Sequence, residues 1–379
     1  MRVQKNPGQP IFPGPATCHI SLMPLVELYG HEEIRALLSD SAATGKLPGS
    51  LLFHGPRGVG KQRLALWLGQ LLLCTEEERP CGKCRSCQYA RNMTHPDLHW
   101  YFPRPRLKDA DPKLSDVVDD AQDAIAERLA NGGLYPAPPG NEAIYVATVR
   151  AIVQQASLSP AIGTKKVFVI GDAERMVPQE GAEFAANAFL KLLEEPSSKT
   201  TIILTSSEPG ALLPTIRSRA VSIRVPRLPD AAVRAFLSDP VVAAALRDTN
   251  AAKSTAEWMG IAAGAPGELF GNESKSRSIA AARKLIDAAL SPRESARHAA
   301  TLSIGGAGAR GSFADTLDSL LVLIGERMRS ALHDSDAARA LGASRAADAV
   351  ARAAEQADGN VNPQLITARL LRELASNLS

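Results

Sequence analysis

The sequence predicts an α/β domain built on a parallel sheet, followed by domains made of helices alone. In the first part of the chain, helical segments alternate with apolar runs that have the composition of buried strands. The four runs are residues 50–53, 165–170, 200–205 and 221–225. Beyond Leu228 the strand signal is absent, and alanine-, leucine- and arginine-rich helices run from Ser276 to the end.

We expect four segments from these changes in pattern. Their bounds are 1–21 for a loose tail, 22–227 for the α/β core, 228–275 for a small helical domain and 276–379 for a helical bundle. Within the core, residues 100–140 are rich in proline and glycine around a charged helix. We interpret that stretch as a surface insertion.

The composition is that of an ordinary globular protein, and the sequence has the features of neither a membrane-spanning nor a secreted protein. Of the 379 residues, 45% are apolar and 22% charged. A net charge of +3 is too small to predict nucleic-acid binding, so DNA contact would depend on partners or on local basic residues such as Arg104, Arg106 and Lys108. No apolar run reaches the ~18 residues of a membrane span. The first twenty residues contain four prolines and do not resemble a secretory signal. We expect a cytoplasmic protein with reduced thiols.

The stretch from His54 to Gln62 has the sequence HGPRGVGKQ and lies between a predicted strand and a predicted helix. This context predicts a phosphate-binding loop formed by Gly55, Gly58, Gly60 and Lys61, in which backbone N–H groups, a helix N-terminus and a lysine face an anion. Gln62 stands where such loops carry Ser or Thr, whose hydroxyl binds Mg²⁺. We expect a loop that can hold ATP or ADP but lacks a part needed for hydrolysis.

Four of the five cysteines follow that helix with the spacing C-x6-C-x2-C-x2-C: Cys74, Cys81, Cys84 and Cys87. Four thiolates at this spacing predict a closed, structural Zn²⁺ site, the alternative being reduced cysteines without metal. His95 and His99 lie nearby, but Pro96 breaks the helix that would align them. We therefore interpret both histidines as structural residues.

The order of these motifs, together with two later ones, resembles the subunits of bacterial DNA polymerase III clamp loaders. The later motifs are NAFLKLLEEP at 187–196 and LPTIRSR at 213–219. The resemblance covers residues 22–270 well. It implies an AAA+ core with an inserted zinc module (74–87), a helical lid and a C-terminal collar, and ATP as the nucleotide.

Within that family, three parts that hydrolysis uses are altered here. Gln62 replaces the hydroxyl residue, and Gly171 falls where the strand tip carries the Mg²⁺-binding Asp, with Asp172 at the position of the catalytic Glu. The lid sequence from Gly264 to Glu268 has no arginine, whereas the motor subunits carry one there. Arg219, by contrast, stands where the family carries the arginine finger that enters a neighbouring subunit's ATP site.

The resemblance therefore implies a subunit of the delta-prime type, inactive as an ATPase on its own. It would support ATP-driven loading of the sliding clamp onto primed DNA, with the gamma/tau and delta subunits as partners and Arg219 acting in trans. Arg219 as an ordinary surface arginine remains the alternative for that residue. The alternatives for the chain are an ATP-hydrolysing gamma/tau-type motor and an unrelated zinc-binding AAA+ adaptor.

Overall fold

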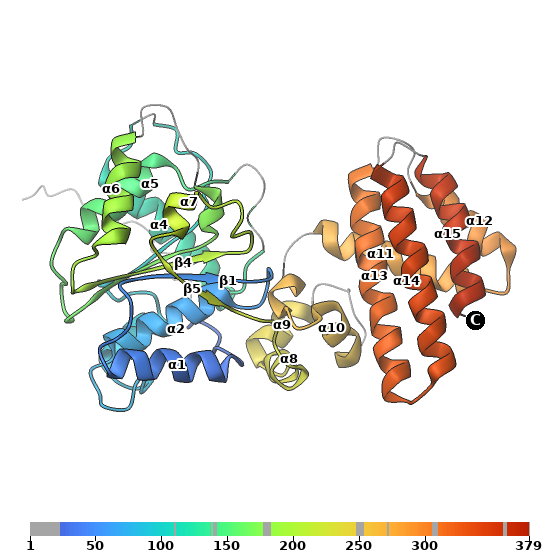
Figure 1. Cartoon of the computed structure of the whole chain (residues 1–379), viewed down its shortest axis with the longest axis horizontal. Helices are drawn as coiled ribbons and strands as arrows, with labels where there is room; N and C mark the ends of the chain where they lie inside the picture. The colour runs from blue at the N-terminus through green and yellow to red at the C-terminus, as the bar shows by residue number, and fades with distance from the viewer. Residues whose placement is uncertain are drawn as a thin grey trace, which may run out of the picture.

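A five-stranded, fully parallel sheet forms the core of the first part of the molecule, in the strand order β2-β3-β4-β1-β5 (Figure 1). The computed structural model describes residues 23–109, 111–136, 138, 142–176, 183–247, 254–270, 273–304, 310–358 and 362–378. The strands are β1 (Ser50–His54), β2 (Leu98–Tyr101), β3 (Lys166–Ile170), β4 (Thr200–Ser206) and β5 (Val221–Arg224). The four strands that the sequence predicts are all present.

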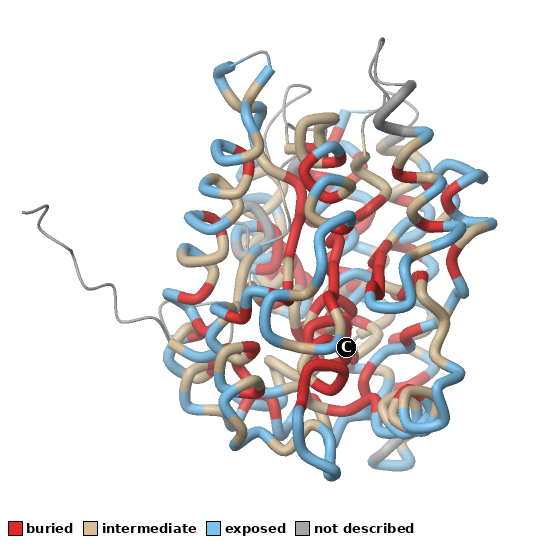
Figure 2. The backbone as a smooth tube through the Cα atoms, turned by 90° about the vertical axis from the view of Figure 1, so that its left-hand side faces the viewer, coloured by how far each residue is buried: buried red, intermediate tan, exposed pale blue. Residues whose placement is uncertain are grey.

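Helices cover both faces of the sheet, which explains why its central strands are apolar throughout. Along β1, Leu51 and Phe53 pack in one apolar cluster, while Leu52 between them packs in another. The first cluster includes α2 (Lys61–Leu73), with α1 (Glu32–Ala43) beside it, and the second includes α5 (Val146–Ala156), α6 (Glu183–Glu194) and α7 (Pro214–Arg217). Figure 1 shows these two layers on opposite sides of the strands, and Figure 2 shows buried residues concentrated between them.

The predicted surface insertion is wrong at its beginning, because Trp100 and Tyr101 belong to the buried edge strand β2. Sequence reasoning missed this strand. Farther along, the charged helix is present as α4 (Leu114–Leu129), but its Ala124 and Leu129 lie in the same apolar cluster as α2. Gly132 approaches Val26 so closely that a Cβ there would lie 3.0 Å from the valine side chain. The stretch is therefore part of the core packing.

After β5 the chain is helical and forms two packed groups with separate apolar cores. We call the first group, α8 (Asp230–Leu237), α9 (Pro240–Arg247), α10 (Thr255–Ala262) and the short 3₁₀ helix η2 (Pro266–Leu269), the lid helices. The second group, the C-terminal bundle, contains α11 (Glu273–Leu290), α12 (Glu294–Ser303), α13 (Arg310–His333), α14 (Ala337–Asp358) and α15 (Pro363–Leu378). Figure 1 shows the lid helices between the sheet and the bundle.

The boundary predicted at 275/276 falls inside α11, which begins at Glu273. Ile279 on α11 still packs in the core of the lid helices, so this helix joins the two groups. The predicted tail of residues 1–21 lies outside the described residues. Among the helices that the structure describes, none is long and apolar enough to cross a membrane.

Candidate nucleotide site and cysteine cluster

The predicted phosphate loop lies at the carboxyl end of β1, where it connects to α2. Gly60 precedes the first helical residue with a φ of 94°, and Gly58 has a φ of 76°, values that favour glycine. Gly55 passes so close to β5 that any side chain there would overlap the carbonyl oxygen of Val225. The five residues that sequence analysis assigned to the loop are thus brought together at one point.

Backbone N–H groups of this loop are available to an anion. Over the described part of the chain, no acceptor receives a hydrogen bond from the N–H groups of residues 57–60. They precede the N-terminus of α2, whose partial positive charge adds to theirs. The loop also lines a cavity of about 590 Å³, which is the size of a small-molecule site. Its apolar lining includes Leu28, Ile261 and Phe270.

Lys61 is buried, and its ammonium group is held inside the loop. Its Nζ donates to the carbonyl oxygens of Gly55 at 2.9 Å and Pro56 at 2.7 Å, and to Ser207 Oγ at 2.9 Å. Burial lowers the pKa of Lys61 to about 8, although the carboxylates of Asp172 and Glu174 act in the opposite direction. The ammonium group is therefore mostly charged at neutral pH and lies where phosphate would be bound.

Gln62 is held by polar contacts from three different elements. Its Nε2 donates to Asp172 Oδ2 at 3.0 Å, and Trp100 Nε1 donates to its Oε1 at 3.0 Å. Arg128 Nη1 lies 3.5 Å from the same Oε1. Because the indole nitrogen can only donate, the orientation of the amide is fixed chemically.

Gly171, at the carboxyl end of β3, leaves the space that the Gln62 amide occupies. A Cβ built on Gly171 would lie 2.5 Å from Gln62 Cδ and Nε2, and closer still to Oε1. The next residue, Asp172, is half-buried, and this burial raises the pKa of its carboxyl, with Glu174 adding to the shift and Lys61 opposing it. The two altered positions that sequence analysis singled out are therefore in direct contact.

The lid helices touch the phosphate loop through η2. The Gly267 N–H donates to the Gly58 carbonyl at 2.8 Å, and the Glu268 side chain packs where a Gly58 side chain would stand. The turn from Gly264 onward is thus adjacent to the phosphate loop. It brings a carboxylate to the loop in place of an arginine.

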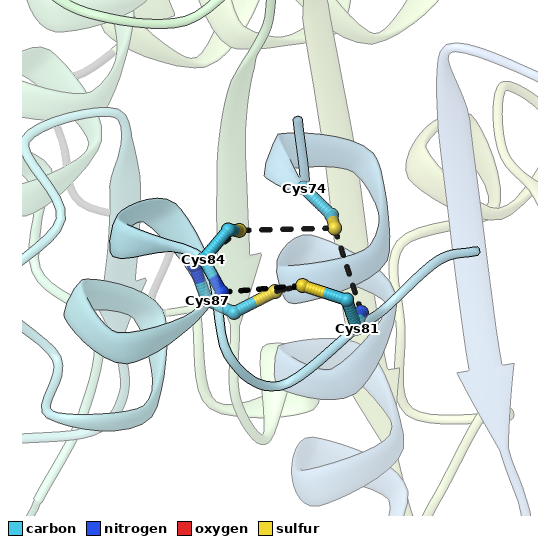
Figure 3. Close-up of side chains that lie close together, drawn as sticks. All are labelled: Cys74, Cys81, Cys84 and Cys87. Atoms are coloured by element: carbon cyan, nitrogen blue, oxygen red, sulfur yellow. Dashed lines mark hydrogen bonds between the residues drawn. The ribbon is translucent and has the colours of Figure 1, made fainter. Parts of the chain in front are cut away.

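Four sulfur atoms converge between the end of α2 and the start of α3 (Arg85–Arg91), as Figure 3 shows. Cys74 Sγ lies 3.9 Å from Cys84 Sγ, and Cys81 Sγ lies 3.9 Å from Cys87 Sγ. Tetrahedral coordination with Zn–S bonds of about 2.3 Å places sulfurs about 3.8 Å apart. All four sulfurs lie within 4.8 Å of one another. The cluster therefore has the dimensions of a site for one tetrahedral metal ion.

The two nearby histidines make other contacts. A nitrogen of His95 lies 2.8 Å from Ser86 Oγ, and its other ring nitrogen accepts from the Asp97 N–H at 3.0 Å. The His99 ring stacks on Phe168 with centroids 4.7 Å apart. Both contacts are consistent with the structural roles expected for these residues.

Arg219 lies between α7 and β5, the edge strand of the sheet. Its Nε is 3.2 Å from Glu194 Oε2, and its Nη1 donates to the Thr215 carbonyl at 3.0 Å. The side chain is 29% exposed. It precedes the amino end of β5, whereas the phosphate loop follows the carboxyl end of β1, the parallel neighbour of β5, so the two lie at opposite ends of these strands.

Sequence reasoning missed three residues of the candidate nucleotide site: Trp100, Arg128 and Ser207. Ser207 follows a predicted strand, and the aromatic run Trp100–Phe102 is typical of a strand, so both carried a usable signal. Arg128 carried none, because it belongs to a helix with many charged residues.

Comparison with known proteins identifies the family. The family model described as "DNA polymerase III, delta subunit" matches residues 30–229, which is 200 of the 379 residues. DNA polymerase III subunit delta' of Pseudomonas aeruginosa is 34% identical over 203 residues, 52% of this chain and 49% of that protein. DNA polymerase III subunit gamma/tau of Mycobacterium tuberculosis (strain ATCC 25618 / H37Rv) is 30% identical over 215 residues, 56% of this chain and 30% of that protein.

A solved structure from Thermotoga maritima, titled as a DNA polymerase III gamma subunit-related protein, covers 90% of this chain and 99% of its own. Its identity is 16% and its TM-score 0.43, so it adds nothing to the assignment. The sequence matches to the curated relatives span half of those proteins or less. Because the family model covers more than half of the sequence, the chain belongs to the DNA polymerase III clamp-loader family, in the group that the delta-subunit model describes.

Proposed function

We propose that this chain is a clamp-loader subunit of the delta-prime type, which binds beside ATP-hydrolysing subunits and does not hydrolyse ATP itself. In this role it supports the ATP-driven loading of a sliding clamp onto primed DNA in the cytoplasm. Its partners are the gamma/tau and delta subunits, and it meets the clamp and DNA through the assembly. The relatives named delta' support this assignment.

The contact between Gln62 and Gly171 carries the proposal. Phosphoryl transfer from ATP depends on positioning and charge neutralisation, most of which an Mg²⁺ ion supplies. Here the carboxamide of Gln62 occupies the space next to Gly171, and no hydroxyl or carboxylate is present at either position. Glu268 stands near Lys61 where a cationic lid residue would assist. Losing these contacts lowers the rate of hydrolysis by orders of magnitude.

Arg219 is proposed as the residue that acts on the neighbouring subunit's ATP. Its pairing with Glu194 is solvent-accessible, and exposed ion pairs contribute only about 0–1 kcal/mol, so the guanidinium can exchange this carboxylate for a phosphate at little cost. Leu213 and Val221 flank it in sequence and are 44% and 51% exposed. An exposed edge with large apolar side chains is suited to a protein partner.

The cysteine cluster is proposed to hold one Zn²⁺ ion with a structural role. Four cysteine ligands complete a tetrahedral shell, and backbone N–H groups of Cys81, Lys83, Cys84 and Cys87 point at the sulfurs at 3.2–3.5 Å. Such N–H groups stabilise thiolates, the form that binds zinc. The metal would connect the end of α2, and thus the phosphate-loop helix, to α3.

The test of this function is ATP turnover by a gamma/tau motor assembled with this chain, a delta subunit, the clamp and primed DNA. We expect Arg219→Ala to reduce turnover by about 10³-fold at the single interface that it serves, the lower end of the range for arginine fingers. Arg217→Ala is the matched control, because Arg217 is exposed two residues away on the same turn. Equal rates of ATP turnover in assemblies that contain the wild type and Arg219→Ala would rule out a role for Arg219 as an arginine finger.

A gamma/tau-type motor is the second candidate, and the mycobacterial gamma/tau relatives at 30% identity are the observation that favours it. A motor needs Mg²⁺ ligands next to the loop, which positions 62 and 171 do not supply. The third reading, an unrelated zinc-binding AAA+ adaptor, is excluded by membership of the clamp-loader family.

A further inference from the structure

The position beside the phosphate loop that a magnesium ion would take is filled by protein. The ion's usual ligands would come from a hydroxyl at position 62 and a carboxylate at position 171. Instead, the Gln62 amide extends over Gly171, leaving less than van der Waals distance for any side chain there. The residues present therefore do not fit a bound Mg²⁺ ion.

The amide cannot easily leave this position, because its two ends are both engaged. Trp100 and Asp172 hold it from β2 and from the end of β3. Gln62 and Trp100 are also buried, so an open amide would leave an indole N–H and a carboxylate without partners. The Gln62 side chain thus depends on the absence of a side chain at position 171.

A half-buried arginine, Arg128, supplies positive charge next to the amide. The Arg128 guanidinium is enclosed by aromatic rings, with its Cζ 3.2 Å from the centroid of Phe102, 3.6 Å from Tyr135 and 4.7 Å from Trp100. Burial lowers its pKa to about 10, so it is charged at neutral pH. The guanidinium is within electrostatic reach of Asp172, the carboxylate that accepts the hydrogen bond from the Gln62 amide.

The remaining parts of an anion site are intact. The N–H groups of residues 57–60 are open, within the described chain, and Lys61 is positioned among them. Fixed positive groups at the site, Lys61, Arg57 and Arg128, stand against the carboxylates of Asp172, Glu174 and Glu268. The protein balances its own carboxylates here without help from a metal ion.

We propose that this loop binds the phosphates of a nucleoside di- or triphosphate without a divalent cation, the Gln62 amide standing in the cation's place. This inference deepens the proposed function, because it rests on the same site being unable to hydrolyse ATP. Its failure is separate, however: a chain that binds no nucleotide at all can still donate Arg219 to a neighbour.

The test is titration of the full chain with a fluorescent N-methylanthraniloyl derivative of ADP, in Mg²⁺ and again in EDTA. We expect the dissociation constants in the two buffers to agree within about twofold, because positions 62 and 171 do not supply the metal's usual ligands and the Gln62 amide fills the space between them. Lys61→Ala should abolish binding in both buffers. Binding that needs Mg²⁺, or no binding in either buffer by the folded wild type, would overturn the proposal.

A double substitution gives an independent outcome. Gln62→Thr with Gly171→Asp restores both types of ligand and removes the overlap between the two positions, so nucleotide binding should become at least about tenfold weaker in EDTA than in Mg²⁺. Gln70→Thr makes the same exchange two turns along α2 and is the matched control, expected to remain indifferent to the metal. If the folded double variant, checked by its melting temperature, also binds equally in both buffers, the assignment of Gln62 to the cation's place is wrong.

Discussion

Replacing Gly171 with alanine perturbs the contact on which the nucleotide site depends. The new Cβ would lie about 1 Å inside ordinary contact distance from the Gln62 amide, so the amide has to move. Moving it breaks the hydrogen bonds with Asp172 and Trp100, both 3.0 Å long, of which the first is partly and the second fully buried. Each buried group left without a partner costs about 1–3 kcal/mol, so the free energy of unfolding should fall by about 2–4 kcal/mol.

The same substitution should be nearly harmless when Gln62 is already alanine. Gln62→Ala alone has a cost of similar size, since it leaves Asp172 and Trp100 unpaired, but it empties the space that the new Cβ needs. The double variant should therefore be about as stable as Gln62→Ala alone. The expected coupling energy between the two positions is about 2–4 kcal/mol, well above the ~0.5 kcal/mol seen between independent sites.

The assay is urea unfolding of the full chain, followed by tryptophan fluorescence, for the wild type, both single variants and the double variant. Gly163→Ala is the control for the glycine, because a Cβ there meets nothing closer than 3.6 Å. Combined with Gln62→Ala, the control should show additive effects. Additive free energies for Gly171→Ala and Gln62→Ala would refute the reasoning that the two residues share one space.

Three further predictions concern other parts of the molecule. Asp97 accepts hydrogen bonds from the N–H groups of residues 161–163 at 2.6, 2.9 and 3.0 Å. Burial raises its pKa, but these bonds outweigh that effect and bring the pKa below the usual value. Asp97→Asn should therefore lower the free energy of unfolding at pH 7 by about 2–4 kcal/mol. In urea unfolding, the gap in this free energy between wild type and variant should shrink as the pH falls below about 4, and a gap that does not depend on pH would contradict the prediction. Because burial lowers the pKa of Lys61 to about 8, ADP affinity should weaken above pH 8, by up to about tenfold per pH unit; an affinity that is flat to pH 9.5 would show that the ammonium group is not at the phosphates. Mass spectrometry should find one Zn²⁺ ion on the wild type, and Cys81→Ser should lose this ion and melt at a temperature lower by at least about 5 °C. A wild type without zinc, or a variant that keeps both the ion and the melting temperature, would show that the cluster is not a metal site.

The regular parts of the fold were predictable because local pattern determines them. Buried parallel strands with helices on both faces are continuous apolar runs, and β1, β3 and β4 have this pattern. The cysteine cluster was equally predictable from the sequence, since its four cysteines come from one short segment with a regular spacing. In these cases the determining contacts are near in sequence.

The contacts that decide the chemistry were harder to predict from the sequence, because they join residues distant in the chain. The substitutions at Gln62 and Gly171 are visible in the sequence, but their direct contact is not. β2 is only four residues long and includes a histidine, so its pattern is weak. Arg128 belongs to a charged helix, and only the tertiary structure places its guanidinium among aromatic rings.

The most direct test of the central claim is ATP turnover by the purified full chain in the presence of Mg²⁺, compared with Lys61→Ala. The account predicts that both proteins show the same background rate, because the position for the metal is occupied by the Gln62 amide. Steady hydrolysis by the wild type that disappears in Lys61→Ala would contradict it and would make this chain a motor.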